Sequence, residues 1–286
     1  MDLRGNVKSQ ARAVHKKTLW IRMPRRALLV GFATLVGFAT QLSITTLDAH
    51  AQGGGAAQAA APQKTARASA QKDFTGYWVS VITEQWHLRM LMPPKGEFTL
   101  LPLNAEARAA ANMWTPAQDA GNECRAYGAP VIMRVPGRLH IHWADDNTLE
   151  VDTDAGKQTR LFHFGASARP TDLQPTWQGY SVATWAGTPI SRTAKVPGPE
   201  GDIRVVTTQL KAGYLRKNGA PYSEKATVDE YYDTFTEPDN NSWLVVTSIV
   251  TDPQYLTDPY TYTVHFKKIP DGQGWDPAPC VADEVR

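Results

Sequence analysis

The feature that most constrains the fold is an alternation of apolar and polar residues that runs through most of the chain after Asp73. In the segment NTLEVDTDAGKQTRLFHFG, the alternation holds over 149–152, breaks at the turn residues 154–156 and resumes over 160–164. Successive side chains of a β-strand point to opposite faces of a sheet, so a period of two predicts strands and the break predicts a turn. The segment is therefore predicted to form a β-hairpin.

Short strands of this kind recur along the chain, each bounded by Gly, Pro, Asn or Asp. Asn218-Gly219 in LRKNGAPYSE is a strong turn signal and predicts another hairpin. One segment, NAEARAAANMW, favours a helix, with Asn104 as its N-cap and an end before Pro116. Further strands are predicted at 74–84, 130–135, 138–144, 177–186, 203–211, 226–236, 243–251 and 259–268.

A chain of about ten short strands with little helix must protect its sheet edges, either by closing into a barrel or by stacking two sheets. The simplest arrangement is an antiparallel meander that forms a closed or nearly closed barrel. The sequence shows no internal repeat of fixed period, which argues against a propeller. The predicted fold class is therefore an all-β barrel with one short helix.

The expected first strand carries Gly76-Tyr77-Trp78, which resembles the G-x-W motif of lipocalin-like barrels, where the aromatic residue closes one end of the barrel. The segments TGYWVSVITEQW, MPPKG, IMRVPGRLHIHW, LKAGYLRKNGAPYSE and WLVVTSIVTDPQYL look like those of a group of exported bacterial β proteins, most of them uncharacterised. This second resemblance covers nearly the whole expected barrel. It implies an exported single-domain β protein and implies no activity.

Residues 1–51 are predicted to be a secretory signal peptide. A basic stretch ends at Arg25-Arg26, an apolar run follows to about Leu47, and Ala49-His50-Ala51 supplies an A-x-A cleavage site. A twin-arginine signal and an uncleaved anchor remain as alternatives. Residues 52–72, rich in Ala, Gly and Gln, are predicted to be a disordered linker, and 73–286 a single β-barrel domain.

Cleavage after Ala51 would remove eight basic and two acidic residues and leave 22 basic and 26 acidic ones, a formal net charge of −4. This balance gives no indication of nucleic-acid binding. Cys124 and Cys280 are the only cysteines, and in an oxidising compartment such a pair is predicted to form one disulfide. The predicted location is the periplasm or the exterior of the cell, without stable membrane insertion after cleavage.

The segment RLHIHW places His140 and His142 on one face of a predicted strand. Their Cα atoms would lie roughly 6–7 Å apart, which permits both imidazoles to bind one metal ion. A third ligand would be needed, and His163, Asp145 and Glu150 are the candidates. The alternative is that the polar face of this strand simply faces water.

The segment DEYYDTF places Glu230 and Tyr232 on one face of another strand. In a barrel cavity, a carboxylate and a phenol can have their pKa values separated, so that one group takes a proton and the other donates one. The alternative, favoured by the usual exposure of charged residues, is a row of solvent-facing acids beside core aromatics.

The segment KAGYLRKNGAPYSE gathers basic and aromatic residues around a turn, where they would form either a solvated hairpin tip or a cationic mouth that attracts a carboxylate. Its candidate residues include Lys211. The predicted ligand-binding residues of this segment are Tyr214, Arg216, Lys217 and Tyr222. The other predicted ligand-binding residues are His142, Trp86, Arg89 and His265. The predicted catalytic residues are His140, His163, Glu230 and Tyr232.

Signatures of several enzyme classes are missing from the sequence: G-x-S-x-G, the Walker loop, H-E-x-x-H and C-x-x-C. The sequence therefore predicts an exported barrel that binds a hydrophobic or aromatic small molecule in an internal pocket, with no cofactor. Two alternatives remain open. One is a cofactor-free lyase or isomerase that uses His, Glu and Tyr for acid-base chemistry, and the other is a metal-dependent His-x-His site.

Overall fold

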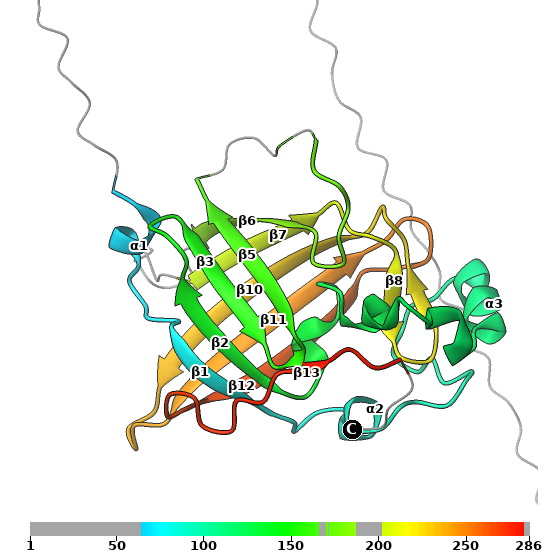
Figure 1. Cartoon of the computed structure of the whole chain (residues 1–286), viewed down its shortest axis with the longest axis horizontal. Helices are drawn as coiled ribbons and strands as arrows, with labels where there is room; N and C mark the ends of the chain where they lie inside the picture. Colours follow the sequence, from blue (N-terminus) through cyan, green and yellow to red (C-terminus); the bar gives the residue numbers. More distant parts are fainter. Residues whose placement is uncertain (1–63, 166–169, 171, 187–201, 283–286) are drawn as a thin grey trace, which may run out of the picture. The chain divides into compact units, whose positions relative to one another are not determined.

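In the computed structural model, nine strands form a closed barrel in the order β1-β12-β11-β10-β7-β6-β5-β3-β2 (Figure 1). The structure describes residues 64–165, 170, 172–186 and 202–282, all within the unit Ala60–Arg286. The predicted signal peptide, residues 1–51, and the first part of the predicted linker lie outside the described residues. The predicted β-barrel class is confirmed.

The barrel strands contain six to ten residues each. They are β1 (Gly76–Val81), β2 (Arg138–Trp143), β3 (Thr148–Thr153), β5 (Gln158–Phe164), β6 (Tyr180–Ala186), β7 (Asp202–Thr208), β10 (Thr227–Thr236), β11 (Ser242–Thr251) and β12 (Tyr260–Ile269). Outside the barrel, β4 (Ala155–Gly156) pairs with β13 (Ala278–Pro279), and β8 (Gly213–Arg216) with β9 (Ala220–Tyr222). The helices are α1 (Ala66–Ser69), α2 (Trp86–Arg89), α3 (Ala105–Met113) and the 3-10 helices η1 (Pro116–Asp119), η2 (Glu123–Tyr127) and η3 (Ile132–Arg134).

The barrel is mixed and not purely antiparallel, because β5 and β6 pair in parallel. A parallel pair requires the chain to return to the end of the sheet where the first strand begins, which takes about a dozen residues or more. The connection from Gly165 to Gly179 has that length. All other pairs around the barrel are antiparallel, so the predicted meander is correct except at this connection.

Barrel closure gives every strand residue an inner or an outer position. On β3, Leu149 and Val151 are buried inside, whereas Glu150 and Asp152 are partly exposed outside. Trp78 of the G-x-W motif is fully buried, and its indole N–H donates to the carbonyl of Phe74 at 3.0 Å. The alternation in the sequence thus corresponds to the two sides of the barrel wall.

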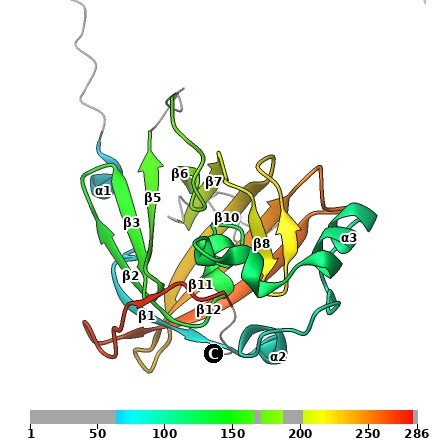
Figure 2. The same ribbon diagram turned by 45° about the vertical axis from the view of Figure 1, so that its right-hand side comes forward.

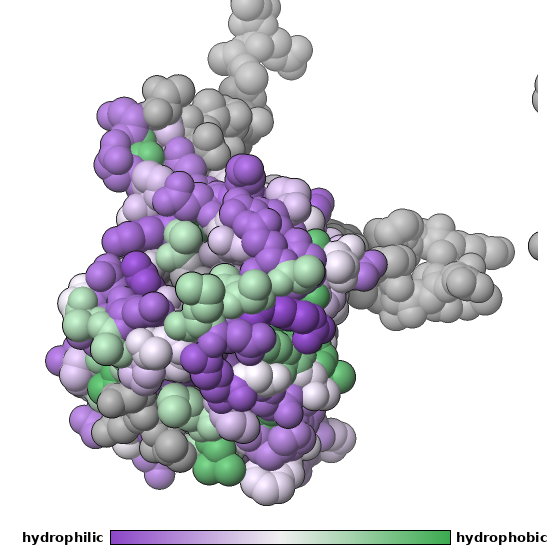
Figure 3. Space-filling model, turned by 90° about the vertical axis from the view of Figure 1, so that its right-hand side faces the viewer, coloured by the Kyte–Doolittle hydropathy of each residue, from purple (hydrophilic) through white to green (hydrophobic). Residues whose placement is uncertain are grey.

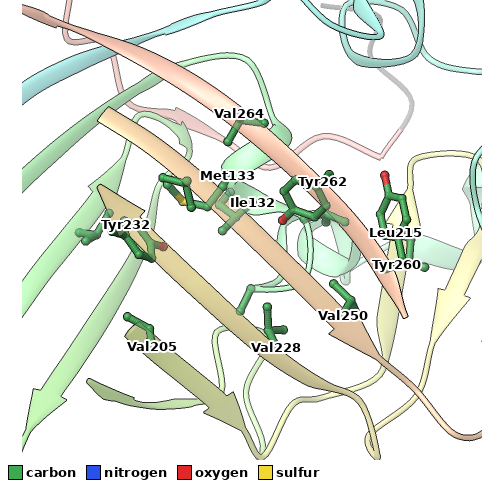
Figure 4. Close-up of a cluster of buried hydrophobic side chains, with 14 of the residues drawn as sticks. Ile132, Met133, Val205, Leu215, Val228, Tyr232, Val250, Tyr260, Tyr262 and Val264 are labelled. Atoms are coloured by element: carbon green, nitrogen blue, oxygen red, sulfur yellow. The ribbon is translucent and has the colours of Figure 1, made fainter. Parts of the chain in front are cut away.

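The segment 130–135 was predicted as a strand, and this prediction is wrong, because it contains the 3-10 helix η3. Ile132 and Met133 are both buried, so burial does not alternate along this segment. Figure 4 shows their side chains among those of the barrel strands, beside Tyr232 and Tyr262. The segment plugs the barrel and contributes side chains to its core.

The plugged end of the barrel is covered by α2, α3 and the β8–β9 hairpin, which lie on the same side of the barrel in Figures 1 and 2. The helix α3 and the hairpin around Asn218-Gly219 were both predicted. The side chain of Asn104 accepts a hydrogen bond from the N–H of Ala107 at 2.9 Å, as expected of an N-cap. On the face shown in Figure 3, hydrophobic residues form small patches among hydrophilic ones.

The described chain begins before the expected domain boundary at residue 73. Ala66 in α1 is buried, and Lys72 Nζ lies 2.7 Å from Asp202 Oδ1 and 2.5 Å from Asp233 Oδ1. These contacts attach the end of the predicted linker to β7 and β10. Within the described ranges, no helix has the length and apolar character needed to cross a membrane.

The predicted disulfide is present between Cys124 in η2 and Cys280 near the C-terminus. It lies beside the short parallel pair β4–β13, where the N–H of Ala278 donates to the carbonyl of Asp154 at 2.9 Å. The bond joins residues 156 positions apart and therefore connects η2 to the C-terminal segment beside β4.

Replacement of both cysteines by serine is expected to lower the free energy of unfolding by roughly 3–5 kcal/mol, because the unfolded chain regains the entropy of an open loop. Urea unfolding monitored by circular dichroism measures the change. Wild-type protein treated with a reductant serves as the control and should match the double variant. A loss below about 1 kcal/mol in both samples would show that the C-terminal segment is held by its other contacts.

Candidate functional site

The two histidines of RLHIHW lie on the outer face of β2. His140 and His142 are partly exposed, and their rings stack with centroids 4.6 Å apart. Tyr77 on β1 stacks on His140 at 4.2 Å. Burial lowers the pKa of His140, and the neighbouring His142 lowers it further. Neither imidazole reaches the interior, because the inner positions of this strand belong to Leu139 and Ile141.

His163 also faces outward, but from β5, where it lies opposite Thr148 of β3. Its ring stacks on Tyr180 at 4.8 Å, and burial lowers its pKa. No contact with His140 or His142 is present in the described part of the chain. The charge of Asp145, in the turn after β2, raises the pKa of His163, but by less than burial lowers it.

Glu230 and Tyr232 occupy inner positions of β10 and are fully buried in the barrel. The guanidinium of Arg160, also fully buried, donates to both carboxylate oxygens of Glu230 at 3.0 and 2.5 Å and to the Tyr232 hydroxyl at 3.1 Å. Burial alone would lower the pKa of Arg160, but the charge of Glu230 raises it. Burial raises the pKa of Tyr232 well above its usual value. The group is a closed ion pair inside the core.

The four predicted catalytic residues therefore do not form one site. His140 and His163 lie on the outer wall, on different strands, and Glu230 and Tyr232 lie inside it. The wall of the barrel separates the imidazoles from the carboxylate and the phenol. An acid-base mechanism that needs all four groups around one substrate has no support in this geometry.

The other predicted ligand-binding residues divide into separate groups. Trp86 is 60% exposed, and His265 lies on the outer face of β12 with its Nδ1 3.6 Å from a Glu84 carboxylate oxygen. Tyr214 and Tyr222 line a cleft between α3 and the β8–β9 hairpin, where Arg125 donates to the Tyr214 hydroxyl at 3.2 Å. The remaining three, Arg89, Arg216 and Lys217, line a different pocket together.

This pocket, here called the arginine pocket, lies at the plugged end of the barrel and has a volume of about 70 Å³. It is formed by the chain around α2, by the plug and by β8. Its cationic lining residues are Arg89, Arg134, Arg216 and Lys217. Its apolar lining residues are Leu88, Met90, Leu91, Met92, Pro93, Ala126, Val131, Val135, Pro136 and Leu215.

Three of the cationic side chains, Arg89, Arg134 and Arg216, are buried. Arg89 is paired with Glu84 and donates through Nε to the carbonyl of Arg134 at 3.0 Å. In the described chain, the other two arginines hydrogen-bond only to neutral oxygens. Arg134 donates to Tyr260 Oη at 2.5 Å and to Gln85 Oε1 at 2.9 Å, and Arg216 donates to the carbonyls of Glu97 and Thr99 at 3.2 and 2.5 Å.

The pocket therefore holds more buried positive charge than its carboxylates neutralise. Burial lowers the pKa values of Arg89 and Arg216, and the nearby charge of Arg134 lowers both further. Two buried donors, Nη2 of Arg89 and Nε of Arg216, have no hydrogen-bond partner in the described structure. Buried charges and buried donors are costly unless they are paired, so an anion would be stabilised here.

Arg134 is the residue of this pocket that sequence reasoning missed. It stands in the segment 130–135, which was predicted as a strand, and a strand would have given no reason to bring it near Arg89 or Arg216. Its guanidinium also lies over the rings of Tyr260 and Tyr262, at 5.8 and 5.5 Å from their centroids. An arginine inside an otherwise apolar segment was the available signal.

A second group of polar side chains could hold a metal ion. His140, His142 and Asp152 offer ligand atoms that all lie within 4.8 Å of one another. Asp152 was not among the predicted third ligands.

The chain matches no protein-family model, no curated protein and no solved structure. Its function is therefore argued from these two sites alone.

Glu230→Gln is expected to lower the free energy of unfolding by about 3–5 kcal/mol, because Arg160 would remain charged in the core without a carboxylate. Asp229→Asn is the matched control. It removes the partner of Arg204 on the outer face of the same strand, and such an exposed pair contributes less than about 1 kcal/mol. Urea unfolding of both variants measures the difference. Equal effects would contradict a structural role for the buried pair.

Proposed function

We propose that the protein binds a small molecule that joins an anionic group to an apolar body, and that the arginine pocket holds it. The observation that carries this proposal is the set of three buried guanidiniums, of which only Arg89 is paired with a carboxylate in the described chain. A carboxylate or a phosphate accepts the paired hydrogen bonds that guanidiniums offer. The buried, unpartnered donors of Arg89 and Arg216 add to the positive charge that no carboxylate of the described chain balances here.

The apolar part of the ligand is inferred from the rest of the lining. Ten of the fourteen lining residues are apolar, so the charged head would be surrounded by aliphatic side chains. A volume of about 70 Å³ suits a small head group but not a large molecule. Met90 and Leu91 line the pocket and are also exposed, so a longer apolar chain can continue from the pocket along them.

Binding, and not turnover, is the function supported by the lining. Among the residues that form the pocket, none has a carboxylate, imidazole, hydroxyl or thiol side chain that could serve in acid-base or nucleophilic chemistry. The amine of Lys217 donates to the Tyr127 hydroxyl at 2.8 Å. The pocket lies at the end of the barrel and not in its interior, where the sequence led us to expect it.

The proposed compartment is the periplasm or the exterior of the cell. The disulfide between Cys124 and Cys280 supports an oxidising environment, and the N-terminal residues 1–51 have the pattern of a signal peptide. The resemblance to exported bacterial β proteins is consistent with this proposal. An exported binding protein would meet its amphiphilic ligand outside the cytoplasm.

Decanoate is a suitable probe, because it joins a carboxylate to an aliphatic chain, and decanol is its uncharged counterpart. Decanoate is expected to bind at least about 10-fold more tightly than decanol, since the carboxylate gains charge-assisted hydrogen bonds. Isothermal titration calorimetry measures both affinities. The same affinity for both probes, or no binding of decanoate at millimolar concentration, would contradict the proposal.

Lys217→Met and Arg89→Met are expected to weaken decanoate binding by roughly 10- to 100-fold and to leave decanol binding nearly unchanged. Lys211→Met is the matched control: Lys211 belongs to the same basic segment but does not line the pocket, and its amine lies over the Trp177 ring at 4.4 Å. If Lys211→Met weakens binding as much as Lys217→Met, the effect comes from net charge and the assigned pocket is wrong.

A further inference from the structure

The pairing of β2 with β3 brings two histidines and two carboxylates together on the outer wall of the barrel. In the register of this antiparallel pair, His140 lies opposite Asp152, and His142 lies opposite Glu150. Residues that face each other across two strands project from the same face of the sheet. The four polar side chains therefore form one cluster, well removed in the strand order from the buried residues of β10.

The distances in this cluster suit an ion placed between the side chains. Oδ2 of Asp152 lies 3.9 Å from Nδ1 of His140 and 3.9 Å from Nδ1 of His142. These separations are too long for direct hydrogen bonds. They are about twice the length of a bond from zinc to nitrogen or oxygen, which is roughly 2.0–2.2 Å. Nδ1 of His142 is shielded from solvent and has no hydrogen-bond partner in the described structure.

Asp152 is oriented as a metal-binding carboxylate would be. The hydroxyl of Thr159 on β5 donates to its Oδ1 at 2.5 Å, so the other oxygen, Oδ2, is the one directed at both imidazoles. Partners of this kind fix the direction of a ligating carboxylate and are common around metal sites.

Aromatic side chains hold the first imidazole in place. Tyr77 stacks on His140, and Trp275 in the C-terminal segment approaches both rings edge-on, at 5.6 Å from Tyr77 and 6.1 Å from His140. The ring of His140 is therefore packed by Tyr77, His142 and Trp275, while the cluster stays partly open to solvent. An open side leaves a coordination position for water, and Glu150, whose Oε1 lies 3.9 Å from Nε2 of His142, faces the other nitrogen of that ring.

We propose that His140, His142 and Asp152 bind one divalent transition-metal ion of the zinc class. Two imidazoles and one carboxylate form a ligand set that suits such ions better than magnesium or calcium, which take oxygen ligands. The site is distinct from the arginine pocket and shares no residue with it. The inference therefore goes beyond the proposed function and does not depend on it.

The test is isothermal titration calorimetry of the full chain with Zn²⁺ after treatment with a chelator, and the expected result is one ion per chain. His142→Ala and Asp152→Asn are each expected to weaken binding by about 100-fold or more, since each removes a ligand. His163→Ala is the matched control, because this histidine lies on the same outer wall but outside the cluster. It should leave the affinity unchanged.

Thr159→Val tests the orientation of the carboxylate without removing a ligand, and is expected to weaken Zn²⁺ binding by about 10- to 100-fold. Co²⁺ absorption in the visible range reports whether the geometry of the bound ion has changed. Absence of binding to the wild type at about 100 μM Zn²⁺ would overturn the proposal. So would equal losses in His142→Ala and His163→Ala, because binding would then involve other residues.

Discussion

Strand β1 pairs with β12 on one side and with β2 on the other, and this double pairing closes the barrel. Closure removes free sheet edges and assigns each residue of the wall to the core or to the solvent. The consequence is visible on two strands. Glu230 of β10 must lie in the core and requires a buried partner, which is Arg160, whereas His140 of β2 must lie outside. Closure therefore places the ion pair of Glu230 inside the barrel and the histidines of β2 on its outer wall.

Buried charges are paired in the interior of the barrel, whereas positive charge is in excess at its plugged end. Inside, the charges of Arg160 and Glu230 are paired through two hydrogen bonds, so this buried pair is neutral without a bound ion. At the plugged end, Arg134 and Arg216 are buried beside Arg89 with a single paired carboxylate, Glu84. A structural network is neutralised by its own residues, whereas a surplus of buried charge of one sign leaves charge that a bound anion would neutralise. This contrast favours the end of the barrel over its interior as the place for the proposed ligand.

The sequence was sufficient to predict the barrel, the hairpin at Asn218-Gly219, the helix capped by Asn104 and the disulfide, because each depends on local pattern or on a count of two cysteines. It did not predict that 130–135 forms the plug. Runs of apolar residues are ambiguous between strands and buried turns, and here the tertiary position inside the barrel decides. Arg89, Arg216 and Lys217 were selected by residue type, but only the plug places Arg134 among them.

Asp152 shows how near a sequence argument came to the cluster on the outer wall. The alternation places Glu150 and Asp152 on one face of β3, and His140 and His142 on one face of β2. Which carboxylate meets both imidazoles depends on the register of the two strands, and that register is set by the turn between Trp143 and Thr148. A shift by one residue would turn every carboxylate of β3 into the core and the apolar residues out. The core therefore fixes which face of β3 points outward, and the turn fixes the register in which Asp152, held by Thr159, faces both histidines.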